Sequence, residues 1–285
     1  MRKPKFTPPP GACDTHLHIY GPFDRFPLSS DRVYNIQRSG TLEDYTALMD
    51  QLGLERAVVV NGGGNGYNNA VTLDAIARSN GRLKGLALIK PETTDNELLA
   101  LHQGGMTGFR TRATGRGAPT LAEAALIAER VREFGWHVEF HVRSVEDAHD
   151  ALPNLQSMGL PYVLDHVSYL GPERPLSDPL AQTILRTLRE DEKCWVNLYS
   201  FYQRSHTGAP GYADMIPIVR ALVEAAPDRV VWGTNWPHVV IEVADPDNVD
   251  LIDFVFDALP EDDLRTRVLA TNPARLYGWP ASTSG

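Results

Sequence analysis

The residues Ala12-Cys13-Asp14-Thr15-His16-Leu17-His18-Ile19 form a short apolar run that carries two histidines two positions apart. Such a run predicts a β-strand, in which successive side chains point to opposite faces. His16 and His18 then project from one face and can converge on one small volume. Two imidazoles directed at one point are typical of a metal site or of an acid–base site. The alternative is that both histidines only bond to nearby loops.

Seven further apolar runs follow, and helical patterns lie between them. The predicted strands are 12–19, 57–61, 83–89, 108–110, 137–142, 162–165, 195–198 and 230–233. The predicted helices are 41–52, 67–79, 95–103, 120–134, 145–157, 178–190, 212–226, 248–258 and 264–269. Eight βα units in 285 residues predict one α/β domain over 1–285, a (β/α)₈ TIM barrel. We expect the proline-rich residues 1–10 to form an extended arm before it.

The alternative fold is an open doubly wound sheet that binds a nucleotide. Its first strand would be followed by a G-x-G-x-x-G turn, which is missing here. The run Gly62-Gly63-Gly64-Asn65-Gly66 lacks the Lys-Ser/Thr pair of a phosphate loop. We interpret it as a tight loop that lets a substrate approach the backbone.

Composition excludes several classes of function. The formal net charge is −9 and no lysine- or arginine-rich run occurs, which argues against nucleic-acid binding. No apolar run approaches the roughly 18 residues of a membrane span, and residues 1–12 lack the apolar core of a signal peptide. The two cysteines form no CxxC pair, as is common in a reducing compartment. We therefore expect a cytoplasmic protein.

Polar residues recur where six of the eight predicted strands end. In a barrel of this kind catalytic groups lie at the carboxyl ends of the strands. Burying polar groups is costly, so their collection at one end predicts an active site there. These residues are His16, His18, Arg110, Arg112, His141, Asp165, His166, Asn197, Tyr199, Ser200, Asn235 and His238. His137, by contrast, opens its strand and is expected at the other end. Whether Asp165 orients a neighbour or caps its strand stays open.

The motifs also resemble a known family, the amidohydrolase superfamily. They are Asp14-Thr-His-Leu-His18, His141, His166, Gly233-Thr-Asn-Trp-Pro-His238 and the closing Asn272-Pro-Ala-Arg-Leu-Tyr277. The opening Thr7-Pro-Pro-Pro-Gly-Ala-Cys-Asp14 and Tyr20-Gly-Pro22 resemble one branch more closely. That branch contains 2-pyrone-4,6-dicarboxylate lactonase, 4-sulfomuconolactone hydrolase and D-galactarolactone isomerase. The resemblance spans nearly the whole chain.

The resemblance implies a set of metal ligands and a way to activate water. His16, His18, His141 and His166 would hold one Zn²⁺ or another divalent metal, which lowers the pKa of a bound water. The pyrone-dicarboxylate member of the branch works without metal. In that case the histidines and arginines polarise the lactone carbonyl, so a metal-free site remains an alternative.

Asn235 departs from the family pattern, which has an aspartate at this position. An amide cannot serve as a general base near neutral pH. Three explanations remain open: an engineered replacement of aspartate, a natural asparagine with different chemistry, or a catalytically silent protein. If the asparagine is natural, His166 or His238 would have to act as the base while Asn235 positions the water.

The expected substrate is a small anionic lactone, opened by attack of water on its carbonyl. Guanidinium groups recognise carboxylates and sulfonates, and the aromatic hydroxyl and imidazole groups can bond ring oxygens. The predicted substrate-binding residues are Arg110, Arg112, Tyr199, Arg204 and His238. A lactone isomerase, a metal-dependent decarboxylase and a silent ligand-binding protein are the alternatives. Barrels of this type often pair, so a homodimer also stays open.

Overall fold

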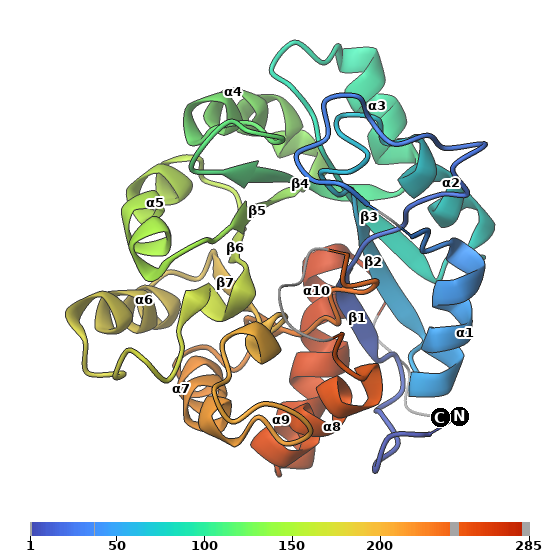
Figure 1. Ribbon diagram of the computed structural model, residues 1–285. Helices are drawn as coiled ribbons and strands as arrows, with labels where there is room; N and C mark the ends of the chain where they lie inside the picture. The colour runs from blue at the N-terminus through green and yellow to red at the C-terminus, as the bar shows by residue number, and fades with distance from the viewer. Residues whose placement is uncertain (1, 37, 240–244, 281–285) are drawn as a thin grey trace.

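The computed structural model describes residues 2–36, 38–239 and 245–280. Eight parallel strands pair in the order in which they occur in the sequence, and helices surround them (Figure 1). The strands are β1 Cys13–Leu17, β2 Arg56–Val60, β3 Leu83–Ala87, β4 Met106–Arg112, β5 His137–His141, β6 Tyr162–Leu164, β7 Cys194–Asn197 and β8 Val230–Val231. This order confirms the predicted (β/α)₈ barrel and excludes the open doubly wound sheet.

Ten α-helices lie in the described part of the chain. They are α1 Leu42–Leu52, α2 Ala70–Arg78, α3 Asp95–Gln103, α4 Leu121–Val131, α5 Val145–Ser157, α6 Pro179–Glu190, α7 Ile216–Ala225, α8 Asn248–Ala258, α9 Asp262–Thr266 and α10 Asn272–Tyr277. Three of the helices that follow strands begin with the same capping box, in which a threonine and an acidic residue satisfy each other's free backbone N–H groups. The pairs are Thr41 with Asp44, Thr94 with Glu97, and Thr120 with Glu123.

The ends of several elements differ from the predicted ones. The first strand stops at Leu17 rather than Ile19, because the His18 N–H leaves the ladder and donates to the Trp236 carbonyl at 2.8 Å. β4 is longer than predicted and runs from Met106 to Arg112. The predicted helix 264–269 is part of a longer segment in which α9 continues through a π-turn into α10. The helix α10 was not predicted.

The interior of the barrel divides into an apolar end and a polar end. At the end where the strands begin, the buried Tyr277 of α10 packs among Cys13, Val58 and Leu86. Its ring also meets His137 edge to face, with the ring centroids 5.1 Å apart. His137 therefore lies where the strands begin, at the end of the barrel opposite their carboxyl ends, as predicted. The other end of the interior holds the buried polar side chains of the site described below.

β1 and β8 meet along a seam that backbone and side-chain bonds close together. The Thr15 N–H donates to the Trp232 carbonyl at 2.9 Å, and the Asn235 N–H donates to the His16 carbonyl at 2.8 Å. The buried Asp14 carboxylate accepts from the backbone N–H of His16, the backbone N–H and hydroxyl of Thr234, and the hydroxyl of Tyr45. Asp14 therefore joins the first strand to the segment that follows the last one.

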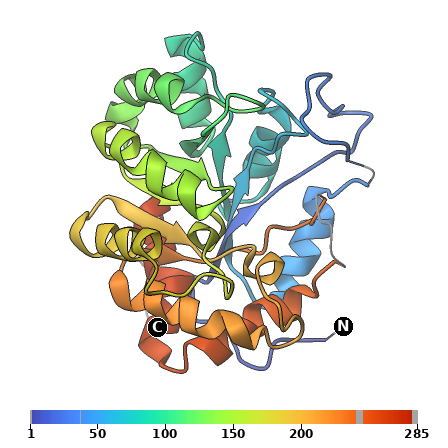
Figure 2. The ribbon, with the colours of Figure 1, turned by 60° about the vertical axis from the view of Figure 1, so that its left-hand side comes forward.

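The N-terminal arm lies along α8, close to the seam (Figure 2). Arg2 pairs with Asp250 at 2.6 Å, and Lys5 pairs with Asp257 at 3.2 Å. The ring of Phe6 stacks on Phe256, with 4.8 Å between centroids. No helix in the described residues is long and apolar enough to cross a membrane.

Candidate active site

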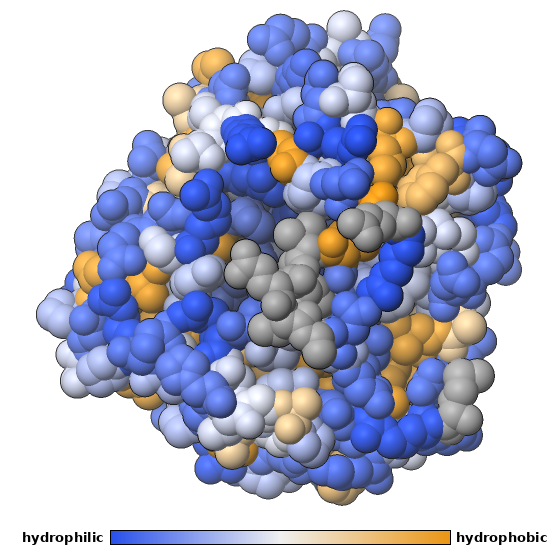
Figure 3. Space-filling model, viewed as in Figure 1, coloured by the Kyte–Doolittle hydropathy of each residue, from blue (hydrophilic) through white to orange (hydrophobic). Residues whose placement is uncertain are grey.

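A cavity of about 640 Å³ opens at the carboxyl ends of the strands. On this face of the molecule, hydrophilic residues predominate around the barrel mouth (Figure 3). Eight of the residues selected from the sequence line the cavity: His16, His18, Arg110, Arg112, His141, His166, Tyr199 and Asn235. Val33, Tyr34, Arg116, Val142, Arg143, Tyr169, Gln203 and Val239 complete the wall.

The two β1 histidines are buried and neutral. Burial lowers the pKa of both rings well below the ordinary value, with further contributions from Arg110 and, for His18, from His16. His18 Nδ1 lies 2.8 Å from the Val60 carbonyl oxygen. Because a carbonyl only accepts, this nitrogen carries the proton, and Nε2 keeps a free lone pair. His16 stacks on the Tyr199 ring at 3.7 Å between centroids.

A buried arginine lies at the floor of the cavity between two carboxylates. Arg110 Nε donates to Glu139 Oε1 at 2.9 Å, and Nη2 donates to Asp165 Oδ2 at 2.7 Å and to the Tyr199 hydroxyl at 3.1 Å. Burial opposes its charge, but Tyr199, Asp165 and Glu139 together raise the pKa of Arg110 above its ordinary value. Burial also raises the pKa of both carboxyls, which share this one cation.

Glu139 is the main site residue that the sequence analysis missed. It lies two positions before His141 on β5, and therefore on the same face of the strand. A charged residue in the middle of a buried strand was the available signal. The sequence left open whether Asp165 orients a neighbour or caps its strand. In the structure its carboxylate binds Arg110 and accepts a hydrogen bond from the Tyr199 hydroxyl at 2.5 Å, so it orients neighbouring side chains.

His141 and His166 form a second pair of neutral imidazoles, with ring centroids 4.6 Å apart. Burial lowers the pKa of both well below the ordinary value. Arg110 Nη2 lies 3.2 Å from His141 Nδ1. A guanidinium only donates, so this nitrogen accepts, and the ring proton of neutral His141 is on Nε2. His166 begins a left-handed turn that continues through Val167, with φ of 52° and 50°. Backbone strain of this kind often occurs at functional sites.

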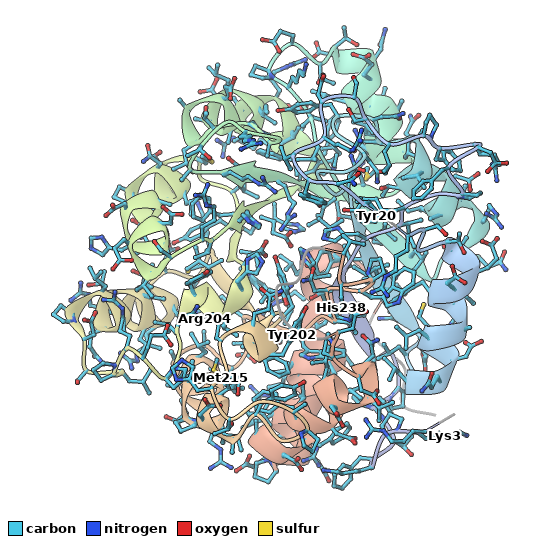
Figure 4. All side chains as sticks on the ribbon, viewed as in Figure 1. Lys3, Tyr20, Tyr202, Arg204, Met215 and His238 are labelled. Carbon is cyan, nitrogen blue, oxygen red and sulfur yellow. The ribbon has the colours of Figure 1, made fainter. Side chains whose placement is uncertain are left out.

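Asn235 and His238 both follow β8, but only Asn235 lines the cavity. The Asn235 amide nitrogen donates to the Ser200 hydroxyl at 3.1 Å and to the Tyr202 hydroxyl at 3.2 Å. Its oxygen has no such partner among the described residues and is the acceptor that Asn235 offers to the cavity. His238 does not line the cavity, because Nδ1 bonds Tyr202 and Nε2 bonds Asn248, each at 3.0 Å (Figure 4).

Some of the predicted substrate-binding arginines line the cavity and one does not. Arg112 lines the cavity, whereas Arg204 lies beside it over the ring of Tyr169 and pairs with Glu173 (Figure 4). Arg143, which the sequence also offers as a guanidinium group near the site, lines the cavity, and so does Arg116, which was not predicted. In the described part of the chain no carboxylate pairs with Arg112, Arg116 or Arg143. Burial and the nearby Arg110 lower the pKa of Arg112, as expected for a cation that lacks a counter-charge.

The donor groups in this cavity include candidate metal ligands, and Arg110 already binds some of them. Among the described residues, ligand atoms within 4.8 Å of one another occur in two groups: His141, Asp165 and His166, and His16, Glu139 and Asp165. Arg110 binds one oxygen of each carboxylate, Glu139 Oε1 and Asp165 Oδ2. The other oxygens, Glu139 Oε2 and Asp165 Oδ1, and both ring nitrogens of His16 are buried without a hydrogen-bond partner among the described residues. The predicted ligand His18 belongs to neither group.

Comparisons with known proteins agree with this fold. The family described as amidohydrolase matches residues 13–279. A 4-sulfomuconolactone hydrolase of Rhizobium radiobacter is 37% identical over 96% of this chain and 92% of its own length. A 2-pyrone-4,6-dicarboxylate hydrolase of Comamonas testosteroni is 33% identical over 98% of this chain and 93% of its own length.

A solved structure extends the agreement to three dimensions. The apo crystal structure of a protein from Agrobacterium tumefaciens superposes with a TM-score of 0.88 and 28% identity, covering 98% of this chain and all of that chain. Family match, relatives and structure all span the same barrel and its cavity. The chain belongs to the amidohydrolase family of enzymes.

Proposed function

We propose that this enzyme opens a small anionic lactone by adding water to the ring carbonyl, using guanidinium and imidazole groups in place of a metal ion. The observation that carries the proposal is the cavity itself. In a protein of net charge −9, it gathers four arginines beside four neutral histidines. Relatives named as hydrolases of a sulfomuconolactone and a pyrone dicarboxylate support the same class of substrate.

Arg110 is the group that we assign to the lactone carbonyl. Its Nε and Nη2 are bound to Glu139, Asp165 and Tyr199. Nη1 has no partner among the described residues and belongs to a residue that lines the cavity. It can donate to the oxygen that becomes negative as water adds. Donors held in place for a developing oxyanion typically contribute about 10²–10³ in rate.

The tautomers assign roles in the reaction to two histidines, His18 and His141. The free lone pair on His18 Nε2 makes it the acceptor for the proton of the attacking water, while the Asn235 oxygen holds that water by accepting a hydrogen bond. The protonated His18 then gives that proton to the ring oxygen as it leaves, and neutral His141 can stabilise this oxygen by donating a hydrogen bond from its Nε2–H. His166 is the alternative acceptor for the water proton. Comparing the activities of variants of His18 and of His166 distinguishes the two.

A panel of carboxylated and sulfonated lactones tests the proposal by ring opening in ¹⁸O-labelled water. We expect one ¹⁸O atom in the new carboxylate, and activity that survives dialysis against a chelator with less than 0.1 metal ion per chain (roughly the level of adventitious binding). His18→Gln should lower kcat by about 10²–10⁴-fold, whereas His149→Gln, on the exposed face of α5, should not. Activity that disappears with the chelator and returns with zinc would reject the metal-free mechanism.

Asn235 favours one second candidate, lactone isomerisation. There the nucleophile is a hydroxyl of the substrate itself, so no group is needed to hold and activate water. The same labelled experiment separates the two reactions, because isomerisation takes up no ¹⁸O. Release of CO₂ would instead identify the decarboxylase, and ligand-dependent stabilisation without any turnover would identify a silent protein.

A further inference from the structure

The long connection between β1 and α1 passes over the β3 and β4 side of the barrel (Figure 1). We call its residues 22–36 the strap. Val33 and Tyr34 of the strap line the cavity. The Tyr34 hydroxyl lies 2.9 Å from the hydroxyl of Tyr20, the residue that follows the β1 histidines. The strap is therefore part of the cavity wall.

Glycines after β2 allow the strap to approach closely. The Ser29 N–H donates to the Gly64 carbonyl at 2.9 Å. A Cβ on Gly63 would lie 2.6 Å from Val33 Cγ2, and one on Gly64 would lie 2.1 Å from Ile36 Cδ1. Neither distance is possible between real carbon atoms. The glycine run thus serves close packing against the strap, in addition to forming the tight loop expected from the sequence.

Val33 also touches a second glycine, across the cavity mouth. A Cβ on Gly117 would lie 2.5 Å from Val33 Cγ1. One methyl of Val33 therefore packs on the loop after β2, and the other packs on the loop after β4. Gly117 has φ +78°, a conformation that itself favours glycine.

Val33 contacts a segment that consists of Arg112, the last residue of β4, and the loop after it, which carries Arg116. Neither arginine has a carboxylate partner among the described residues. We call residues 112–119 the arginine loop. Arg112 Nη1 donates to the Arg116 carbonyl at 3.0 Å, so the position of the loop backbone determines where Arg112 points. Arg143 reaches the same loop through the Thr114 hydroxyl at 3.3 Å. Movement of the arginine loop would displace all three cations.

We propose that Val33 is a positioning residue that locks the strap to the arginine loop and so makes the cavity selective for substrates with two anionic groups. Arg112 is half-buried, and Arg116 and Arg143 are exposed. A second anionic group would give these cations a partner that a single anionic group leaves missing. The inference rests on the proposed function only for the identity of the substrate, because the charge selectivity can be measured by binding alone.

The test is a double-mutant cycle with two aromatic probes, isophthalate with two carboxylates and benzoate with one. We expect wild-type protein to bind isophthalate at least tenfold more tightly than benzoate in calorimetry. Val33→Ala removes both methyl contacts, and Gly63→Ala displaces the strap. Each should weaken isophthalate binding about 5–10-fold and benzoate binding less than threefold, as expected for a change in charge placement alone.

The double variant Val33→Ala/Gly63→Ala should bind isophthalate about as weakly as Val33→Ala alone, because removal of Val33 Cγ2 makes room for the new methyl at position 63 while the contact with Gly117 stays lost. Gly211→Ala, at a glycine with no atom within 4 Å of an added Cβ, is the matched control. Equal binding of both probes by the wild type, or losses that simply add in the double variant, would overturn the proposal. If Gly63→Ala does not fold, Val33→Ala alone still decides through the two probes. Tight isophthalate binding without lactone opening would refute the proposed function but leave this inference intact.

Discussion

At the scale of single residues, Arg110 is the residue on which the site depends. Its guanidinium pairs with two buried carboxylates, Glu139 and Asp165. The same side chain presents a free nitrogen to the cavity. Its structural role and its proposed catalytic role therefore cannot be removed separately by a single substitution.

Arg110→Met should lower the free energy of unfolding by about 3–5 kcal/mol, because it leaves the two carboxylates buried without a counter-charge. Urea unfolding at pH 7.5 measures this change. Adding Asp165→Asn to the variant should recover part of the loss, since one uncompensated charge is removed. Equal stability of Arg110→Met and wild type would show that the carboxylates are already neutral.

Asn235→Asp supplies the carboxylate that the family pattern has at this position. If the water is held by Asn235 and only His18 accepts its proton, a second base should raise kcat for hydrolysis by about 10–100-fold. Steady-state kinetics with ¹⁸O detection measures it, with the exposed Asn80→Asp as control. An unchanged or lower rate would remove position 235 from water activation.

At the scale of the elements, the two ends of a strand serve different purposes, as β5 shows. Residues at its start pack in the apolar interior, and residues at its end line the cavity. His137 at its start packs against Tyr277, whereas His141 at its end lines the cavity. Sequence alone predicted this division because histidine positions and strand direction are visible in the pattern. It could not predict the role of Glu139, because the ion pair with Arg110 joins two strands and depends on their register.

His137 should give the protein a measurable pH dependence of stability. Burial lowers its pKa to about 4, so it is neutral in the folded protein near pH 5. The unfolded chain, with an ordinary pKa near 6.5, takes up a proton below that pH, which favours unfolding as the pH falls. Relative to His137→Phe, wild type should lose about 2 kcal/mol between pH 7.5 and pH 5. Parallel pH curves for the two proteins in urea unfolding would contradict the assignment.

At the scale of the whole molecule, the order of the strands in the barrel was predictable from the sequence. The positions of the segments that pack against the barrel ends and its outer helices were not. Eight alternating patterns specify the barrel, since each strand pairs with its neighbour in the sequence. The strap and α10 were not predicted from the sequence. The arm was predicted, but the residues that it contacts were not. The positions of these segments depend on contacts between distant residues, such as Val33 with Gly117 and Tyr277 with Cys13.

Deletion of residues 2–7 should lower the free energy of unfolding by about 1–3 kcal/mol. The arm contributes the partly exposed stack of Phe6 on Phe256 and the ion pairs of Arg2 and Lys5 along α8, each worth a fraction of a kcal/mol to about one. Lys3→Ala is the control, because its exposed side chain is in none of these contacts (Figure 4). A deletion variant as stable as wild type would show that the arm only lies on the surface.

The Asp14–Thr234 bond at the seam also has a consequence for synthesis. Its two partners are 220 residues apart, so the ribosome releases one long before the other. Until β8 emerges, one edge of β1 has no partner strand, and such edges tend to pair with other chains. Active enzyme can therefore accumulate only from chains translated beyond Thr234, and premature termination before that point should yield aggregation-prone fragments without activity.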